Sequence, residues 1–236
     1  MKTYTSKLIT TIENSDDGLH NYSVTRTLEG IEGDKAIVLT LYPSFSGQDL
    51  FRMDSTAMHM TNHLMNDLQI SSVKVINLFS KIVKGSKMSC RGAEVDEENL
   101  KYIENLMKQK DFEEYIFIVA WGSSMVTCKA ATEAKERIMK MYMELHPNAR
   151  CYQFTCDGLP LKGNEAVHPL YLGIRATHLT WKLRPFSPAD FLKSAEVVEL
   201  KKIKPKAISK KKEGEAVEVD NSKTKITKVV ELPKTT

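Results

Sequence analysis

Four runs of apolar and β-branched residues alternate along the chain with segments of helical periodicity. The runs cover residues 35–41, 72–79, 115–121 and 149–155, the last being shorter and more polar than the others. Short, nearly continuous apolar runs are typical of strands that are covered on both faces. A fifth run at residues 22–29 alternates like a half-exposed strand, and the glycines that follow it predict a hairpin into the strand at 35–41.

Three segments between these runs carry apolar residues at helical spacing, at residues 54–68, 96–108 and 129–145. Asp54 or Ser55 can cap the first of them. Because strands alternate with helices, the pattern predicts an α/β fold. We expect a three-layer α/β/α sandwich with a central, mostly parallel four-stranded sheet plus an N-terminal hairpin strand.

The apolar periodicity fades after Phe191, and residues 200–236 are rich in Lys, Glu and Thr. Such a segment has too little apolar mass to offset the entropy lost on ordering. The sequence therefore predicts one α/β domain over residues 1–199 and a Lys-rich, disordered C-terminal tail over 200–236, in which VVEL at 229–232 could form a short edge strand.

The formal charge of +4 is unevenly distributed. Residues 201–236 hold 11 Lys and 5 acidic residues, which leaves 23 basic and 25 acidic residues in the first 200. A strongly basic nucleic-acid-binding domain is thus excluded, although the lysine cluster at 201–212 could either attract nucleic acid or only keep the chain in solution. Four cysteines without a CxxC pair, and no signal-peptide or membrane-span pattern, favour a cytoplasmic protein.

Ligands of open parallel sheets bind outside the carboxyl ends of the strands. The residues that follow the predicted strands are therefore the candidate ligand-binding residues: Tyr42, Ser44, Asn77, Trp121 and Gly122. The last strand is followed by a loop at 157–171 with His168 near its end. This histidine either hydrogen-bonds a backbone carbonyl or lies over a ligand, where it could stabilise developing negative charge.

Several charged residues have both a structural and a functional interpretation. Asp54 is either a helix cap or an acid or base directed into a cleft. Arg26, Arg175 and Arg184 are either surface ion-pair partners or phosphate ligands at the rim of the cleft.

His59 and His63 have the spacing of a zinc pair but lack a third ligand, so we interpret them as solvent-facing helix histidines and expect neither a metal nor another cofactor. Cys128, Cys151 and Cys156 are interpreted as buried apolar groups.

The ordered motifs LYPS, DST, VINLF, AWG and GLP…HPLY between residues 24 and 181 resemble the bacterial and phage family called domain of unknown function 1643 (DUF1643). The chain is more distantly similar to the uracil-DNA glycosylase superfamily. That similarity implies a glycosylase-like fold in which Tyr42 faces the water-positioning motif, Asn77 the base-reading position and His168 the histidine that stabilises the departing base. Tyr42 stands where the glycosylases have Asn or Asp, and the nearby Gly47-Gln48-Asp49 lacks their following proline.

These patterns lead to one hypothesis and one alternative. The chain is a nucleotide-binding or nucleic-acid-base-binding protein with a glycosylase-like cleft, in which Tyr42 and Trp121 stack on the ligand and His168 and Asp54 are the catalytic candidates. Whether it is an enzyme stays open; a DNA glycosylase-like or nucleotide hydrolase activity would fit. The alternative is a non-enzymatic protein-interaction module, for example a phage-encoded one, that acts on host or defence machinery. An inward Asp54 or Asp49 favours the enzyme.

Overall fold

The computed structural model describes residues 1–3, 5–43, 50, 53–83, 88–158 and 165–203. Seven strands form one mixed sheet: β1 (Leu8–Asn14), β2 (Asn21–Leu28), β3 (Asp34–Thr40), β4 (Ile70–Asn77), β5 (Tyr115–Val119), β6 (Cys151–Cys156) and β7 (Trp181–Phe186). Their order across the sheet is β1-β2-β4-β3-β5-β6-β7. The strands β4, β3, β5 and β6 pair in parallel, whereas β1, β2 and β7 are each antiparallel to their neighbours.

The predicted hairpin between residues 22–29 and 35–41 is wrong. Strand β2 forms its hairpin with β1, and its other neighbour is β4, which separates it from β3. Strands β1 and β7 were also not predicted. Both lie at an edge of the sheet, and β1 buries no residue fully, so neither carries the apolar run that marks an inner strand.

The predicted helices are present with small shifts of their ends: α1 (Ser55–Asn66), α2 (Glu97–Met107) and α3 (Lys129–Leu145). Asp54 caps α1 through a hydrogen bond of 2.7 Å from the Ala57 amide to Oδ1. A short 3₁₀ turn, η1 (Phe112–Glu114), leads into β5, and α4 (Pro169–Arg175) follows β6.

Helix α5 (Pro188–Ile203) was not predicted, and it crosses the expected end of the domain at residue 199. The rest of the expected tail, including VVEL, lies outside the described residues. No helix in the described part of the chain is long and apolar enough to cross a membrane.

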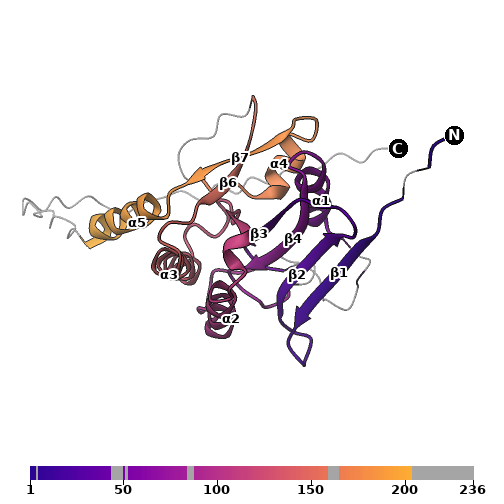
Figure 1. Cartoon of the computed structure of the whole chain (residues 1–236). Coiled ribbons are helices and arrows are strands. Elements are labelled where there is room, and N and C mark those ends of the chain that lie inside the picture. Colours follow the sequence, from indigo (N-terminus) through magenta and orange to yellow (C-terminus); the bar gives the residue numbers. More distant parts are fainter. Residues whose placement is uncertain (4, 44–49, 51–52, 84–87, 159–164, 204–236) are drawn as a thin grey trace, which may run out of the picture.

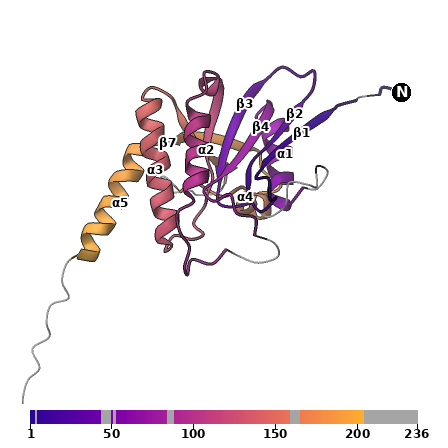
Figure 2. The ribbon, with the colours of Figure 1, turned by 90° about the horizontal axis from the view of Figure 1, so that it is seen from below.

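Helices cover both faces of the sheet (Figures 1 and 2). On one face α2 and α3 cover a core that includes Ile37, Leu39 and Phe117, and α5 lies against α3. On the other face α1 and α4 cover a second core that includes Val38, Ile118 and Trp181. The alternation of Ile37, Val38 and Leu39 between the two cores shows that β3 is buried on both faces, as its continuous apolar run predicts.

Candidate functional site

The carboxyl ends of β3, β4, β5 and β6 lie at one edge of the sheet because these strands pair in parallel. Asp54 begins α1 at this edge, after the segment that follows β3, and His168 begins α4, after the loop that follows β6. Two different connections therefore bring the two catalytic candidates to the edge where open sheets bind ligands.

Asp54 interacts electrostatically with both Arg26 and His168. Its carboxylate favours the charged form of each partner and so acts to raise both pKa values. Burial has the larger and opposite effect, so that the pKa of Arg26 and the pKa of His168 are both lowered. We refer to Arg26, Asp54 and His168 as the Arg-Asp-His cluster.

Arg26 enters the cluster from β2, where it lies between Thr10 of β1 and Val73 of β4. The residue is 7% exposed. Its Nε is buried and has no hydrogen-bond partner among the described residues. A guanidinium that is buried with an unused donor is costly for the fold, and a hydrogen bond from this donor to a ligand oxygen would lower that cost.

His168 is held with one ring nitrogen facing its own helix. The Leu170 amide donates to Nδ1 at 3.2 Å, so the proton of the neutral ring lies on Nε2. Because burial lowers the pKa of His168, the ring is neutral near pH 7 and Nε2 can donate a hydrogen bond.

Gly122 is required beneath His168. Its φ is +67°, and a Cβ at this position would lie 2.7 Å from the His168 Cβ. Its amide donates to the Ala166 carbonyl at 2.7 Å, which fixes the loop just before His168. Gly122, which was predicted as a ligand-binding residue at a strand end, therefore packs against His168 and positions it.

Hydrogen bonds hold the Asn77 side chain and backbone at the carboxyl edge of the sheet. Its Oδ1 accepts a hydrogen bond of 2.5 Å from the Thr40 hydroxyl, and its carbonyl accepts one of 2.8 Å from the Asn99 side chain. These bonds orient the Asn77 amide, whose Nδ2 donates to no described residue. Tyr42, one residue beyond Leu41, is half-buried and packs against the first core.

Trp121 lies in the core instead of the cleft. It is 3% exposed, and its ring packs against Phe186 and Phe191 at centroid distances of 5.9 and 5.4 Å. The Lys135 ammonium lies 5.5 Å from the same ring. This placement corrects the expectation that Trp121 stacks on a ligand: an apolar run such as 115–121 does not show where the buried strand stops and the exposed loop begins.

The expectation that His59 and His63 face solvent is wrong. The His59 ring covers Gly173 of α4, where any side chain would collide with it. His63 is hydrogen-bonded to Asp67 at 2.7 Å and stacks on Trp181 at a centroid distance of 4.2 Å. Both histidines therefore belong to packing around α1.

The remaining predicted residues do not join the cluster. Arg175 is exposed in the last turn of α4, and Arg184 lies on β7 opposite Gln153. Ser44 and Asp49 lie outside the described residues. Within the described part of the chain, no three His, Cys, Asp or Glu side chains are grouped to hold a metal ion.

Lys135 was not among the residues predicted from the sequence. It falls on the buried stripe of α3 between Ala131 and Ile138, and it is 7% exposed. Burial lowers the pKa of Lys135 to about 8. The sequence did contain a signal for this residue. Lys135 follows Ala131 by four positions and precedes Ile138 by three, which places it on the apolar stripe of the predicted helix.

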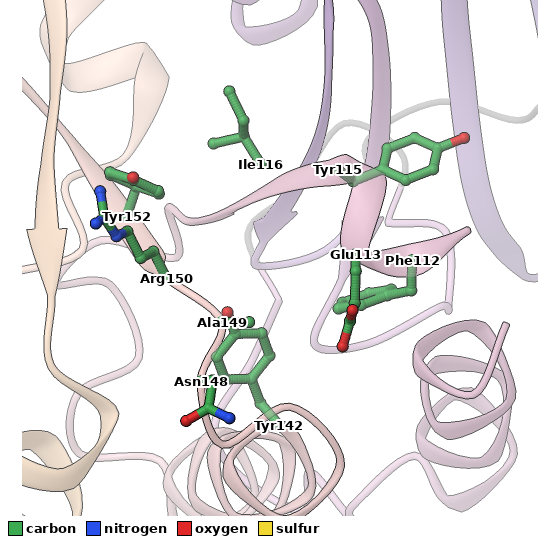
Figure 3. A pocket seen from close by; sticks show the side chains of 9 residues that line it. All are labelled: Phe112, Glu113, Tyr115, Ile116, Tyr142, Asn148, Ala149, Arg150 and Tyr152. Carbon is green, nitrogen blue, oxygen red and sulfur yellow. The ribbon is translucent and has the colours of Figure 1, made fainter. Parts of the chain in front are cut away.

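A pocket of about 310 Å³ lies at the opposite edge of the sheet, where β5 and β6 begin (Figure 3). Phe112, Tyr142 and Tyr152 line it together with the exposed Arg150. The Tyr142 hydroxyl is buried and has no hydrogen-bond partner among the described residues. The pocket contains none of the residues predicted from the strand ends and is separate from the Arg-Asp-His cluster.

The chain matches the model of a known protein family. The model of the family described as protein of unknown function (DUF1643) matches residues 21–170. No curated protein and no solved structure matches the chain. The matched segment includes every member of the Arg-Asp-His cluster, and it ends before β7 and α5.

Proposed function

The chain belongs to the DUF1643 family, and we propose that it binds a nucleotide or a nucleic-acid base at the carboxyl edge of its sheet. The observation that carries the proposal is the Arg-Asp-His cluster, in which one carboxylate interacts with a buried arginine and a buried histidine. The alternative of a non-enzymatic protein-interaction module has no comparable observation in its favour.

The donors of the cluster suit the oxygens of a base or a phosphate. Nε2 of His168 donates one hydrogen bond, the Arg26 guanidinium supplies positive charge and an unused Nε donor, and the Asn77 amide can donate a third. Base edges present carbonyl oxygens and ring nitrogens that accept such bonds. The half-buried Tyr42 ring offers a face on which a base can stack.

Asp54 gives the site a group that can take part in catalysis. Its carboxylate interacts electrostatically with Arg26 and His168, and it also caps α1. In a glycosylase-like reaction a carboxylate orients the attacking water and a neutral histidine stabilises the departing base anion. Because Tyr42 replaces the usual Asn or Asp, Asp54 is the carboxylate we assign to this role, whether the bond cleaved belongs to DNA or to a free nucleotide.

The test is binding and turnover with labelled single- and double-stranded DNA that contains uracil or modified bases, and with free nucleotides. We expect His168→Ala to weaken binding by about tenfold to a hundredfold, since a hydrogen bond to a partly charged oxygen is lost. His178→Ala, at an exposed histidine outside the cluster, is the matched control and should bind like the parent. Absence of binding to all probes, or equal binding by both variants, would contradict the proposal.

Asp54→Asn tests the cluster without unfolding α1, because an asparagine also caps a helix. Loss of the carboxylate removes the effect that raises the pKa of His168, so this pKa should fall further below the ordinary value of histidine. NMR titration of the imidazole signals measures the change. Asp157→Asn, at an exposed carboxylate paired with Lys182, is the control and should leave His168 unchanged. An unaltered His168 pKa in Asp54→Asn would show that the two residues are not coupled.

A further inference from the structure

Strands β5 and β6 separate where they begin, and the pocket of Figure 3 lies at this separation. On its other side β5 pairs with β3 from Tyr115 onward, whereas it pairs with β6 only from Phe117, which lies opposite Cys151. Ile116 and Arg150, the residues just before that first pair, line the pocket instead of pairing with each other. The pocket is therefore an opening in the sheet itself, at the edge opposite the Arg-Asp-His cluster.

Aromatic side chains from both faces of the sheet form the walls of this pocket. Phe112 and Tyr142 are 3% and 2% exposed and belong to the core under α2 and α3, whereas Tyr152 packs against the core on the other face. The rings of Phe112 and Tyr142 lie edge to face at a centroid distance of 6.4 Å. Aromatic walls of this kind suit a planar ring, which can pack against them in the same arrangements.

The size of the pocket limits what it can hold. Its volume of about 310 Å³ lies at the lower end of the range of small-molecule sites, roughly 300–1,000 Å³. A molecule of one or two rings fits this volume, whereas a nucleic-acid strand does not.

The buried part of the pocket contains an unused polar group. The Tyr142 hydroxyl is buried and has no hydrogen-bond partner among the described residues. Figure 3 shows the Tyr142 ring extending from α3 into the space between the other labelled side chains. A buried hydroxyl without a partner is costly, and a hydroxyl or carbonyl oxygen on a ligand ring would satisfy it.

The exposed part of the pocket contains an unpaired positive charge. Arg150 is exposed, and its guanidinium makes no hydrogen bond or ion pair with any described residue. Glu113, the acidic residue of the lining, lies 3.3 Å from Nδ1 of His146. A guanidinium binds a carboxylate or a phosphate through two parallel hydrogen bonds. The free charge at the mouth of the pocket therefore favours an anionic group.

We propose that this pocket binds a small aromatic anion. The ring packs against the aromatic walls, a carboxylate or phosphate on the ring pairs with Arg150, and a hydroxyl or carbonyl oxygen at the other end of the ring bonds to the Tyr142 hydroxyl. The charge at the mouth and the hydrogen bond in the interior together fix the orientation of the ring. This site does not depend on what the Arg-Asp-His cluster binds.

The test is NMR titration of the full-length chain with a series of small probes. We expect 4-hydroxybenzoate and 4-hydroxyphenyl phosphate to bind, and the tighter of the two identifies the anionic group. Benzoate, which lacks the hydroxyl, should bind about twofold to tenfold more weakly than 4-hydroxybenzoate. Inorganic phosphate lacks the ring and 4-hydroxybenzyl alcohol lacks the charge, so both should bind much more weakly than the aromatic anions.

Two variants test the two polar contacts. Arg150→Gln should weaken binding of 4-hydroxybenzoate by about tenfold or more, because a charged hydrogen bond is lost. Tyr142→Phe removes only a hydroxyl without a partner in the fold, and it should bind 4-hydroxybenzoate and benzoate equally. Arg175→Gln makes the same change of charge at an exposed arginine of α4 and should bind like the parent. His168→Ala should also bind these probes like the parent, which separates this site from the Arg-Asp-His cluster.

Four results would overturn the proposal. One is that no aromatic anion binds the parent chain, and another is that inorganic phosphate binds as tightly as 4-hydroxyphenyl phosphate. The third is equal binding of 4-hydroxybenzoate by Arg150→Gln and Arg175→Gln. The last is a preference for 4-hydroxybenzoate over benzoate that persists unchanged in Tyr142→Phe.

Discussion

Asp54 shows that a structural and a functional interpretation of one residue need not exclude each other. Its Oδ1 accepts the hydrogen bond that caps α1, while the carboxylate also interacts with Arg26 and His168. The residue types and strand-end positions in the sequence were sufficient to name all three members of the cluster as candidates. Their convergence was not predictable, because Arg26 reaches the others only through a strand order that no local pattern encodes.

Lys135 gives a prediction at the scale of one residue. Its pKa is lowered from 10.5 to about 8, so the unfolded chain binds more protons than the folded one between these pH values, and stability rises with pH across this window. Below about pH 8 the buried charge costs on the order of 3 kcal/mol, part of which the contact with the Trp121 ring offsets. Lys135→Met keeps the apolar stem and should be more stable than the parent at pH 7.

Urea unfolding at pH 7 and at about pH 10.5 measures this difference, which should shrink toward zero at the higher pH. Lys140→Met, at an exposed position of the same helix, is the control and should show no such dependence on pH. A stability difference that is the same at both pH values would mean that packing, and not the charge, distinguishes Lys135→Met from the parent.

At the scale of elements, the inner strands and three of the helices could be predicted because each carries its own pattern. The pairing of these strands could not be predicted, since β2 and β3 are neighbours in sequence yet are separated by β4 in the sheet. Helix α5 also escaped prediction: half of its residues are apolar, but they do not fall on one clear helical stripe, and the helix packs on α3. Tertiary contacts determine how these strands pair and whether α5 forms, and such contacts cannot be recognised in the local sequence.

The contact between Gly122 and α4 yields a matched pair of variants. Gly158→Ala places an alanine at φ +79° with no atom near its Cβ, so it should cost only about 1–2 kcal/mol of unfolding free energy. Gly122→Ala has a similar φ of +67° but brings its Cβ within 2.7 Å of the His168 Cβ. Gly122→Ala should lower the free energy of unfolding by more than Gly158→Ala does, by about 3 kcal/mol or above, because the backbone at the start of α4 must move.

Urea unfolding compares the two alanine variants, and the binding assay with DNA and nucleotides gives a second readout. Gly122→Ala should also weaken ligand binding, whereas Gly158→Ala should not. Equal losses of stability would show that the left-handed backbone conformation alone requires Gly122.

Charge is distributed unevenly over the whole molecule: residues 1–200 are slightly acidic, whereas residues 201–236 are rich in lysine. The first 200 residues carry 23 basic and 25 acidic side chains, so the domain surface as a whole does not attract phosphates. Affinity for a nucleic acid would then have two separable parts: a shaped site that recognises the base and a charged segment that recognises the backbone.

Replacement of five lysines by glutamine in the full-length chain tests this separation: Lys204, Lys206, Lys210, Lys211 and Lys212. The salt dependence of DNA binding should become shallower by about 0.7–0.9 in log K against log salt for each lost phosphate contact. Preference among bases should stay the same. The control carries the same change of net charge at five exposed lysines among the described residues and should keep the parent slope: Lys101, Lys108, Lys110, Lys129 and Lys140. A changed base preference in the first variant would show that the two parts are not separable.

The order of strands in the sheet also has a consequence for synthesis on the ribosome. Arg26 emerges early with β2, but the strand beside it, β4, emerges only after β3 and α1. His168 follows after most of the remaining chain. The nascent protein therefore exposes a half-formed sheet during most of its translation, and a chain that stops between β2 and α4 carries Arg26 without His168. Premature termination or cleavage between these residues would release fragments of which none carries the complete Arg-Asp-His cluster.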